Sequence, residues 1–215
     1  MTDVNFIRTR PDIAMKACGF IVRPRDDQYY QSGRCSVTCR PLFPTRIAIL
    51  DVLLTDKGGD WYCGYEENEA LSVLVPFGQP DGTLILTYPM NGCALDVRCE
   101  PGGNRIYHDF NGVSMPLSPE GNQTLRVTAD HYMDRFDRHS WRIERVAYRA
   151  GLKKGCYGYS FEHTLICVKQ GSSWGVYNTA VSKGSGRQNN TRLSLVASSF
   201  VCFTLHYVYL CRNSS

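Results

Sequence analysis

Cys93 and His108 are the two residues of this chain whose types and spacing best suggest chemistry. Cys93 follows directly on Asn91 and Gly92, and His108 lies fifteen positions later. A thiol and an imidazole within hydrogen-bond reach are the nucleophile and the base of thiol acyl transfer. Gly92 allows a tight turn that exposes the thiol with the amide N–H groups around it, and such amides can stabilise an oxyanion. The pattern predicts a Cys–His site for attack on a carbonyl carbon.

The spacing alone leaves other interpretations open. The chain has ten cysteines and five histidines, so a pair at this distance arises easily by chance, and buried cysteine is the common case. The same pair could serve a transglutaminase or a cysteine protease, because these reactions differ only in the acyl acceptor or the leaving group. A non-enzymatic binding domain with a buried Cys93 is the third interpretation. Asp109 neighbours His108 but is predicted to point to the opposite face of a strand.

The residues around this pair predict the strands that must position it. Thr83–Tyr88 has the pattern of a strand, and a second strand carrying His108 follows the turn at Pro101-Gly102-Gly103. Two antiparallel strands joined in this way are expected to bring Cys93 and His108 side by side.

Further elements are predicted from apolar runs and turn residues. Arg46–Thr55 is expected to be a buried strand, Glu66–Leu74 a short helix and Thr124–Thr128 another strand. Ala129–His139 is polar with aromatic residues four positions apart, which indicates an exposed helix. Aromatic and β-branched residues predict strands in the C-terminal part at Tyr157–Val168, Trp174–Val181 and Leu193–Leu210, the first two joined by a turn at 170–173.

Composition places the chain among ordinary globular proteins. It has 215 residues, 43% of them apolar and 20% charged, and its net charge of +4 is spread without blocks of like charge. These values predict one domain over 1–215 and no dedicated nucleic-acid or membrane surface. The first residues contain no apolar export segment, so the ten cysteines are expected to be reduced thiols in a cytosol. We expect an α/β, β-rich fold with a β-sandwich core and peripheral helices.

The stretch Thr83–Asn111 resembles the catalytic region of the bacterial glutamine deamidase toxins, the group of cytotoxic necrotizing factor and Burkholderia lethal factor. That family carries its nucleophile after a strand in Leu-Ser-Gly-Cys, where this chain has Met90-Asn91-Gly92-Cys93. The family's catalytic His follows a dozen or so residues later, as His108 does here. A Thr six residues before the Cys has its counterpart in Thr87. The similarity covers about thirty residues.

The resemblance implies a cysteine-dependent hydrolase that deamidates a glutamine side chain of a host protein. Cys93 would be the nucleophile, His108 the base and Thr87 a residue that orients or steadies the site, with oxyanion contacts from the backbone at Gly92 and Asn91. The implied target is a Rho-type GTPase or the helicase of translation initiation. No metal or cofactor is needed, and a monomeric toxin or effector is expected. It would leave the bacterial cytoplasm without a cleaved signal peptide and act in the host cytosol.

Overall fold

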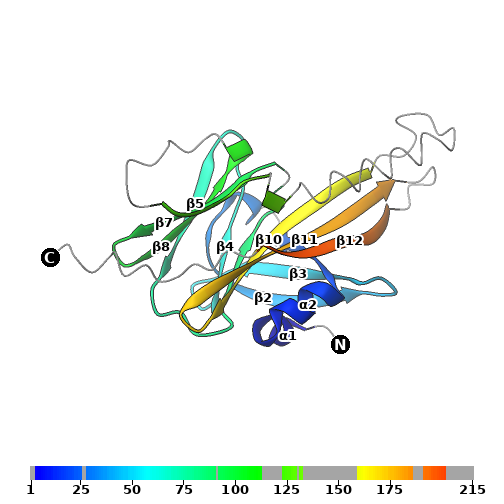
Figure 1. Cartoon of the computed structure of the whole chain (residues 1–215), viewed down its shortest axis with the longest axis horizontal. Helices are drawn as coiled ribbons and strands as arrows, with labels where there is room; N and C mark the ends of the chain where they lie inside the picture. Colours follow the sequence, from blue (N-terminus) through cyan, green and yellow to red (C-terminus); the bar gives the residue numbers. More distant parts are fainter. Residues whose placement is uncertain are drawn as a thin grey trace.

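The computed structural model describes residues 3–25, 28–90, 92–112, 123–129, 131–132, 159–185 and 191–201. Within these ranges the chain is β-rich, with two short α-helices near the N-terminus (Figure 1). The predicted β-rich core with peripheral helices is confirmed.

The larger sheet has eight strands. Its order is β1 (Gly19–Pro24), β3 (Ile47–Leu54), β2 (Gly33–Leu42), β4 (Asp60–Cys63), β6 (Leu84–Thr87), β10 (Tyr159–Gln170), β11 (Ser173–Ser185) and β12 (Thr191–Val201). The pairs β1–β3 and β4–β6 are parallel, and the other neighbours are antiparallel. The sheet curls so that its edge strand β1 meets β11, where the Thr179 hydroxyl accepts the Phe20 N–H and donates to the Phe20 carbonyl.

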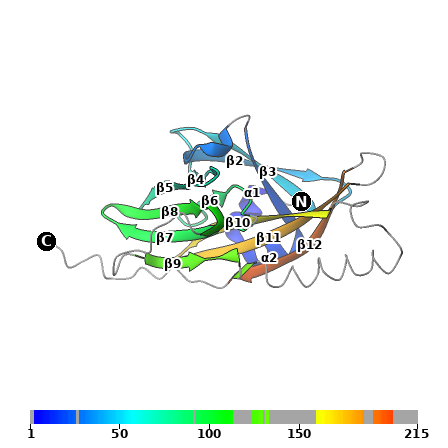
Figure 2. The same ribbon diagram turned by 90° about the horizontal axis from the view of Figure 1, so that it is seen from above.

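The smaller sheet has four antiparallel strands in the order β5 (Ala70–Pro76), β8 (Gly103–Asp109), β7 (Ala94–Glu100) and β9 (Gln123–Val127). Figure 2 shows it beside the larger sheet as a separate layer. Strands β7 and β8 form a hairpin through the turn at Pro101 and Gly102.

A hydrophobic core fills the space between the two sheets. Ile85 and Leu165 from the larger sheet pack with Val73, Leu95 and Ile106 from the smaller one. In a strand, alternate side chains point to the same face, so each strand contributes every second residue to this core. The two sheets therefore share one interior, as a β-sandwich requires.

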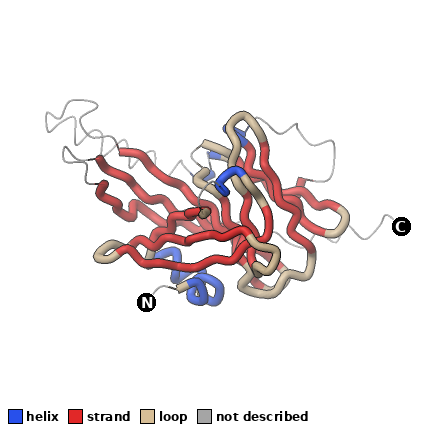
Figure 3. Tube along the Cα trace, turned by 180° about the vertical axis from the view of Figure 1, so that it is seen from behind, coloured by secondary structure: helices blue, strands red, loops and turns tan. Residues whose placement is uncertain are grey.

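The two helices cover the opposite face of the larger sheet. Ile7 of α1 (Val4–Thr9) and Met15 of α2 (Pro11–Ala17) pack against a second core cluster that includes Leu84 and Ile166. Arg8 fixes α1 to the sheet through an ion pair with the buried Asp60 of β4. The helices and the smaller sheet thus lie on opposite sides of the larger sheet, as the view from behind also shows (Figure 3).

Several predicted strands are confirmed. The apolar run at 46–55 is β3, the segment at 124–128 is β9, and the turn at 170–173 joins β10 to β11. The predicted run at 193–210 begins in β12, and its residues beyond 201 lie outside the described part of the chain.

The structure contradicts two local predictions. The segment predicted as a helix at 66–74 is a turn followed by β5, because Val73 and Val75 alternate into the core with the period of a strand. The strand at 83–88 does not pair with the strand of His108: β6 belongs to the larger sheet, whereas β8 pairs with β5 and β7.

The helix predicted at 129–139 is described only at 129 and 131–132, where it is helical. Tyr132 is buried, contrary to the expectation of an exposed helix, because its side chain packs in the core between the sheets. The remaining residues of that segment lie outside the described ranges.

Six described cysteines are thiols: Cys18, Cys35, Cys39, Cys63, Cys93 and Cys167. Cys99 is disulfide-bonded, so the prediction that all cysteines are reduced is wrong at that position.

Candidate functional site

A tight turn carries Cys93 from one sheet to the other. The Cys93 N–H donates to the Met90 carbonyl, and Gly92 has a φ of 105°. A positive φ at the third residue of a four-residue turn favours glycine, which explains why Gly92 stands there. The predicted turn is thereby confirmed, while Asn91 lies outside the described residues. The turn leaves β6 of the larger sheet and enters β7 of the smaller one.

The β7–β8 hairpin places Cys93 and His108 on one face. His108 lies directly opposite Leu95, and Leu95 follows Cys93 by two positions. Side chains two positions apart share a face, so the Cys93 and His108 side chains are diagonal neighbours that point into the core. Both are buried, with 3% and 1% of their surfaces exposed. The register relates the two positions through β7 and β8 rather than through the strand that precedes the cysteine.

Tyr65 contacts the site from the loop after β4. Its ring centroid lies 5.4 Å from that of His108, and the Cys93 thiol is near enough to influence its pKa. Tyr65 is half-buried and precedes an exposed segment at 66–69. One aromatic side chain thus packs close to both members of the pair.

The His108 imidazole is an unsatisfied polar group inside the protein. Neither ring nitrogen has a hydrogen-bond partner among the residues that the structure describes. Burial lowers the pKa of His108 to about 4, and the Gly64 backbone, which lies near the ring without meeting hydrogen-bond geometry, opposes this shift only in part. The imidazole is therefore neutral at pH 7. Buried polar groups are rarely left without partners, so this one requires an explanation.

Thr87 lies in the larger sheet, at the end of β6. Its hydroxyl donates to the Leu165 carbonyl at 3.2 Å and accepts the Leu165 N–H at 3.3 Å. The hydroxyl thereby extends the pairing of β6 with β10 beyond its last backbone pair. Thr87 is also opposite Cys63 of β4, whose thiol contacts the Ile106 carbonyl of β8. Thr87 thus fixes the strand before the turn, and both of these bonds go to β10.

The Gly92 amide, expected to contact an oxyanion, and the adjacent Cys93 amide both have partners already, whereas the other expected position, Asn91, lies outside the described residues. The Gly92 N–H donates to the Tyr132 hydroxyl at 3.1 Å, and the Cys93 N–H donates to Met90. An oxyanion bound at these two amides has to displace the tyrosine hydroxyl and the Met90 carbonyl.

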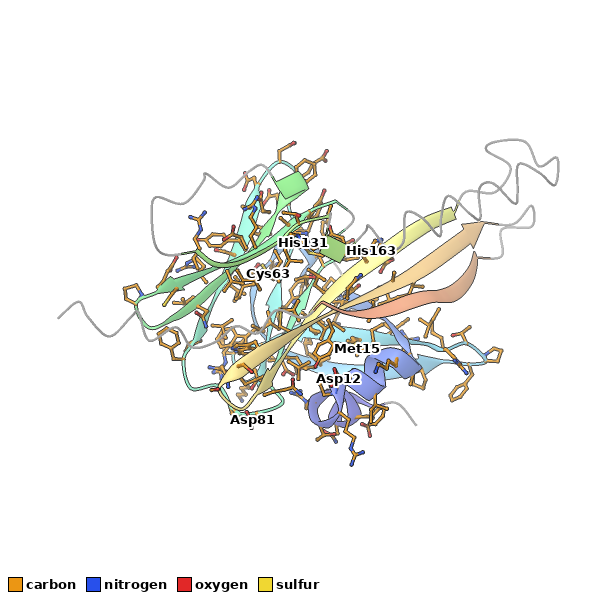
Figure 4. The ribbon with its side chains drawn as sticks, in the orientation of Figure 1. Asp12, Met15, Cys63, Asp81, His131 and His163 are labelled. Atoms are coloured by element: carbon orange, nitrogen blue, oxygen red, sulfur yellow. The ribbon has the colours of Figure 1, made fainter. Side chains whose placement is uncertain are left out.

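Tyr132 is a residue of this site that sequence reasoning missed. Its hydroxyl is 2.7 Å from the Cys93 carbonyl and 3.3 Å from the Met90 carbonyl. The contact joins residues about forty positions apart in the chain, and no local pattern marks it. His163, on β10 in Figure 4, packs its ring 5.4 Å from the Tyr132 ring. His163 is itself buried, with 2% of its surface exposed.

The outer face of the same hairpin carries an ion-pair network. The Arg126 guanidinium lies 2.7 Å from Asp96 and 3.0 Å from Asp109, and neither carboxylate is exposed. The predicted outward direction of Asp109, away from the His108 face, is confirmed. Asp109 therefore takes part in structural pairing across β7, β8 and β9.

The described residues contain no helix long and apolar enough to cross a membrane. They also contain no group of three or more His, Cys, Asp or Glu side chains arranged to hold a metal ion.

Comparison with known proteins leaves the site to be interpreted from its own geometry. No protein-family model matches the chain, and no curated protein has a significantly similar sequence. The arrangement itself offers a thiol on a fixed turn, a neutral imidazole on the neighbouring strand and a hydroxyl that holds the turn. A thiol and an imidazole are the nucleophile and the base that acyl transfer through a thioester uses when the two groups are within hydrogen-bond reach.

Proposed function

We propose that this chain hydrolyses the side-chain amide of a glutamine in a protein substrate, with Cys93 as nucleophile and His108 as base. The observation that carries the proposal is the placement of both side chains on the inner face of one hairpin. The unsatisfied ring nitrogens of His108 support it further, because a buried imidazole without hydrogen bonds has a structural cost that a catalytic role would explain.

In the proposed reaction the Cys93 thiol transfers its proton to the neutral His108 ring while sulfur attacks the carboxamide carbon. The tetrahedral intermediate collapses with cleavage of the C–N bond, and the imidazolium gives its proton to the leaving ammonia. A thioester on Cys93 remains. His108 then removes a proton from water as the oxygen attacks the thioester, which yields glutamate and the regenerated thiol.

Substrate access is part of the proposal. Cys93 and His108 are both buried, so the side chains over them, Tyr65 among them, have to move before a glutamine can reach the sulfur. Thr87 would steady the site from β6 through its two bonds to Leu165. No cofactor enters the chemistry.

The resemblance to deamidase toxins supplies the proposed biological setting. The substrate would be a Rho-type GTPase or the helicase of translation initiation in a host cell. The chain would act as a monomeric toxin or effector in the host cytosol.

Two other functions use the same observations differently. A transglutaminase or a cysteine protease would have the same thiol and imidazole, and added primary amine would be incorporated only by the transglutaminase. A non-enzymatic binding domain is favoured by one specific observation, the burial of Cys93. In that case the thiol would react with iodoacetamide no faster than an ordinary buried cysteine.

The test is ammonia release and intact mass with purified Rho-type GTPase and initiation helicase as substrates. Wild type, Cys93→Ser and Cys167→Ser are compared, because Cys167 is a second buried thiol in the same core. Deamidation adds about one dalton per glutamine, and it should disappear only in Cys93→Ser. Equal activity in wild type and Cys93→Ser would refute the proposed nucleophile. Absence of any mass change on both substrates would reject these targets.

A further inference from the structure

The Tyr132 hydroxyl contacts the backbone of the turn that carries Cys93. Its hydroxyl accepts the Gly92 N–H and lies within hydrogen-bond distance of the Met90 and Cys93 carbonyls. These are backbone groups of three of the four turn residues. A hydroxyl has one hydrogen to donate and lone pairs to accept, so a single oxygen can satisfy both amide and carbonyl groups here.

The burial of Tyr132 keeps this hydroxyl protonated. The side chain is 1% exposed, and burial raises the pKa of Tyr132 far above its ordinary value, with the Gly92 amide acting in the opposite direction. The phenol therefore remains neutral over the whole range in which a thiol enzyme works. It can donate and accept at the same time without a change of charge.

Both the turn and Tyr132 are attached to the larger sheet. The Met90 N–H donates to the His163 carbonyl of β10 at 2.8 Å. The Asn178 side-chain amide of β11 donates to the Tyr132 carbonyl at 3.2 Å. The larger sheet therefore holds Tyr132, and the Tyr132 hydroxyl holds the Met90–Cys93 turn. Together these contacts fix the backbone of Cys93 relative to the larger sheet.

We propose that Tyr132 is the positioning residue of the nucleophile: its hydroxyl fixes the Met90–Cys93 turn so that the Cys93 sulfur faces His108. The catalytic meaning of this assignment rests on the proposed function, whereas the control of the turn does not. Removal of one oxygen leaves the Gly92 amide and the Cys93 carbonyl without this partner, and unsatisfied buried groups favour rearrangement of the backbone.

The experiment compares Tyr132→Phe with Tyr177→Phe. Tyr177 is also fully buried and also loses one hydroxyl, which bonds to Gln170, but it packs in the core cluster on the other face of the larger sheet. The rate of alkylation by iodoacetamide is measured separately at Cys93, Cys63 and Cys167 by peptide mass mapping. Melting temperatures are recorded for each variant.

Release of the turn in Tyr132→Phe should raise the alkylation rate of Cys93 about tenfold or more, with the rates of Cys63 and Cys167 unchanged. Tyr177→Phe should leave all three rates at their wild-type values. An unchanged Cys93 rate in Tyr132→Phe would overturn the proposal. An equal rise at all three thiols would also overturn it, because that result indicates general opening of the core.

The catalytic arm uses ammonia release from the same protein substrates. In Tyr132→Phe kcat should fall about tenfold or more while KM stays within a factor of two, since the tyrosine positions the sulfur rather than the substrate. A wild-type kcat in Tyr132→Phe would overturn the positioning role. If wild type itself releases no ammonia, the proposed function fails, and the alkylation arm still decides whether Tyr132 controls the turn.

Discussion

The two faces of the β7–β8 hairpin differ in whether their buried polar groups are paired. On the outer face, Asp96 and Asp109 have no exposed surface and share the guanidinium of Arg126. On the inner face, His108 is equally buried, and its ring nitrogens have no hydrogen-bond partner in the described part of the chain. His108 and Asp109 are adjacent in β8, so the difference in pairing depends on which face of the strand each side chain occupies.

The comparison contrasts buried polar groups that are paired with a buried polar group that is not. A buried charge that stabilises a fold is paired, because an unpaired one would destabilise it strongly. A buried imidazole without partners adds nothing to the free energy of unfolding and can even lower it. We therefore expect substitutions on the two faces to have opposite signatures: loss of stability on the outer face and loss of reaction rate on the inner face.

The largest expected effect is that of His108→Leu on the reaction rate. Loss of the proposed general base should reduce kcat by roughly 10²–10⁴-fold, because positioned acid–base groups contribute factors of that size. The free energy of unfolding should stay the same or rise by about 1 kcal/mol, since an unsatisfied polar group is replaced by an apolar one. Ammonia release and urea unfolding measure the two quantities.

The control for that variant is His131→Leu. His131 is exposed, and its Nδ1 accepts a hydrogen bond from the Thr128 N–H after β9. It should leave kcat unchanged. A strongly destabilised His108→Leu with normal kcat would reverse the assignment of the two faces.

Removal of the Arg126 guanidinium on the outer face should lower the free energy of unfolding instead of the reaction rate. Arg126→Met leaves two buried carboxylates without their shared partner and should lower the free energy of unfolding by about 3 kcal/mol. Arg40→Met is the matched control, because Arg40 pairs with Asp51 on the exposed surface and such pairs contribute less than about 1 kcal/mol. Urea denaturation of both variants gives the comparison. Similar losses in the two would show that burial does not distinguish these ion pairs.

Acid should lower the free energy of unfolding through His108 on the inner face. The pKa of His108 is about 4 in the folded chain, against an ordinary value of 6.5, so the unfolded chain binds the extra proton first. Stability is then highest above pH 6.5 and falls as the pH is lowered towards 4, by roughly 3 kcal/mol over that window. His108→Leu should lack this component. Urea unfolding of wild type and variant across the window tests it, and identical pH slopes would contradict it.

The smallest effect is expected at Tyr65. Tyr65→Leu removes the ring that packs on His108, and one aromatic contact is worth about 0.5–1.5 kcal/mol. Alkylation of Cys93 should become a few times faster and the pKa of His108 should rise towards 6.5 as water gains access. Tyr30→Leu, at an exposed tyrosine, is the control and should change neither quantity. The histidine proton signals in an NMR titration report the pKa directly.

Local sequence was sufficient to predict several parts of this structure. The runs that became β3, β9, β10 and β11 are apolar or β-branched and end at turn residues, so their type could be assigned without tertiary information. The turn at Gly92 was predictable for a similar reason, because glycine tolerates the positive φ that the turn requires.

Other features depend on contacts between distant segments. The segment at 66–74 begins with helix-compatible acidic residues, but burial of Val73 and Val75 between the sheets imposes a strand. Local sequence also does not specify to which sheet β6 and β8 belong. The role of Tyr132 was hidden in the same way, since its partners lie in a turn about forty positions earlier.

The neighbours of β6 in the larger sheet have a consequence for how the chain folds. Thr87 is held by Leu165, 78 positions further along, and Met90 is held by His163 of the same strand. Contacts of such long range cost loop-closure entropy before they stabilise anything, which slows folding. Because Cys93 and His108 precede β10 in the sequence, they leave the ribosome well before β10 during synthesis. A nascent chain that ends at β9 contains Cys93 and His108 but lacks the strand that holds Thr87 and Met90, the residues before the Cys93 turn.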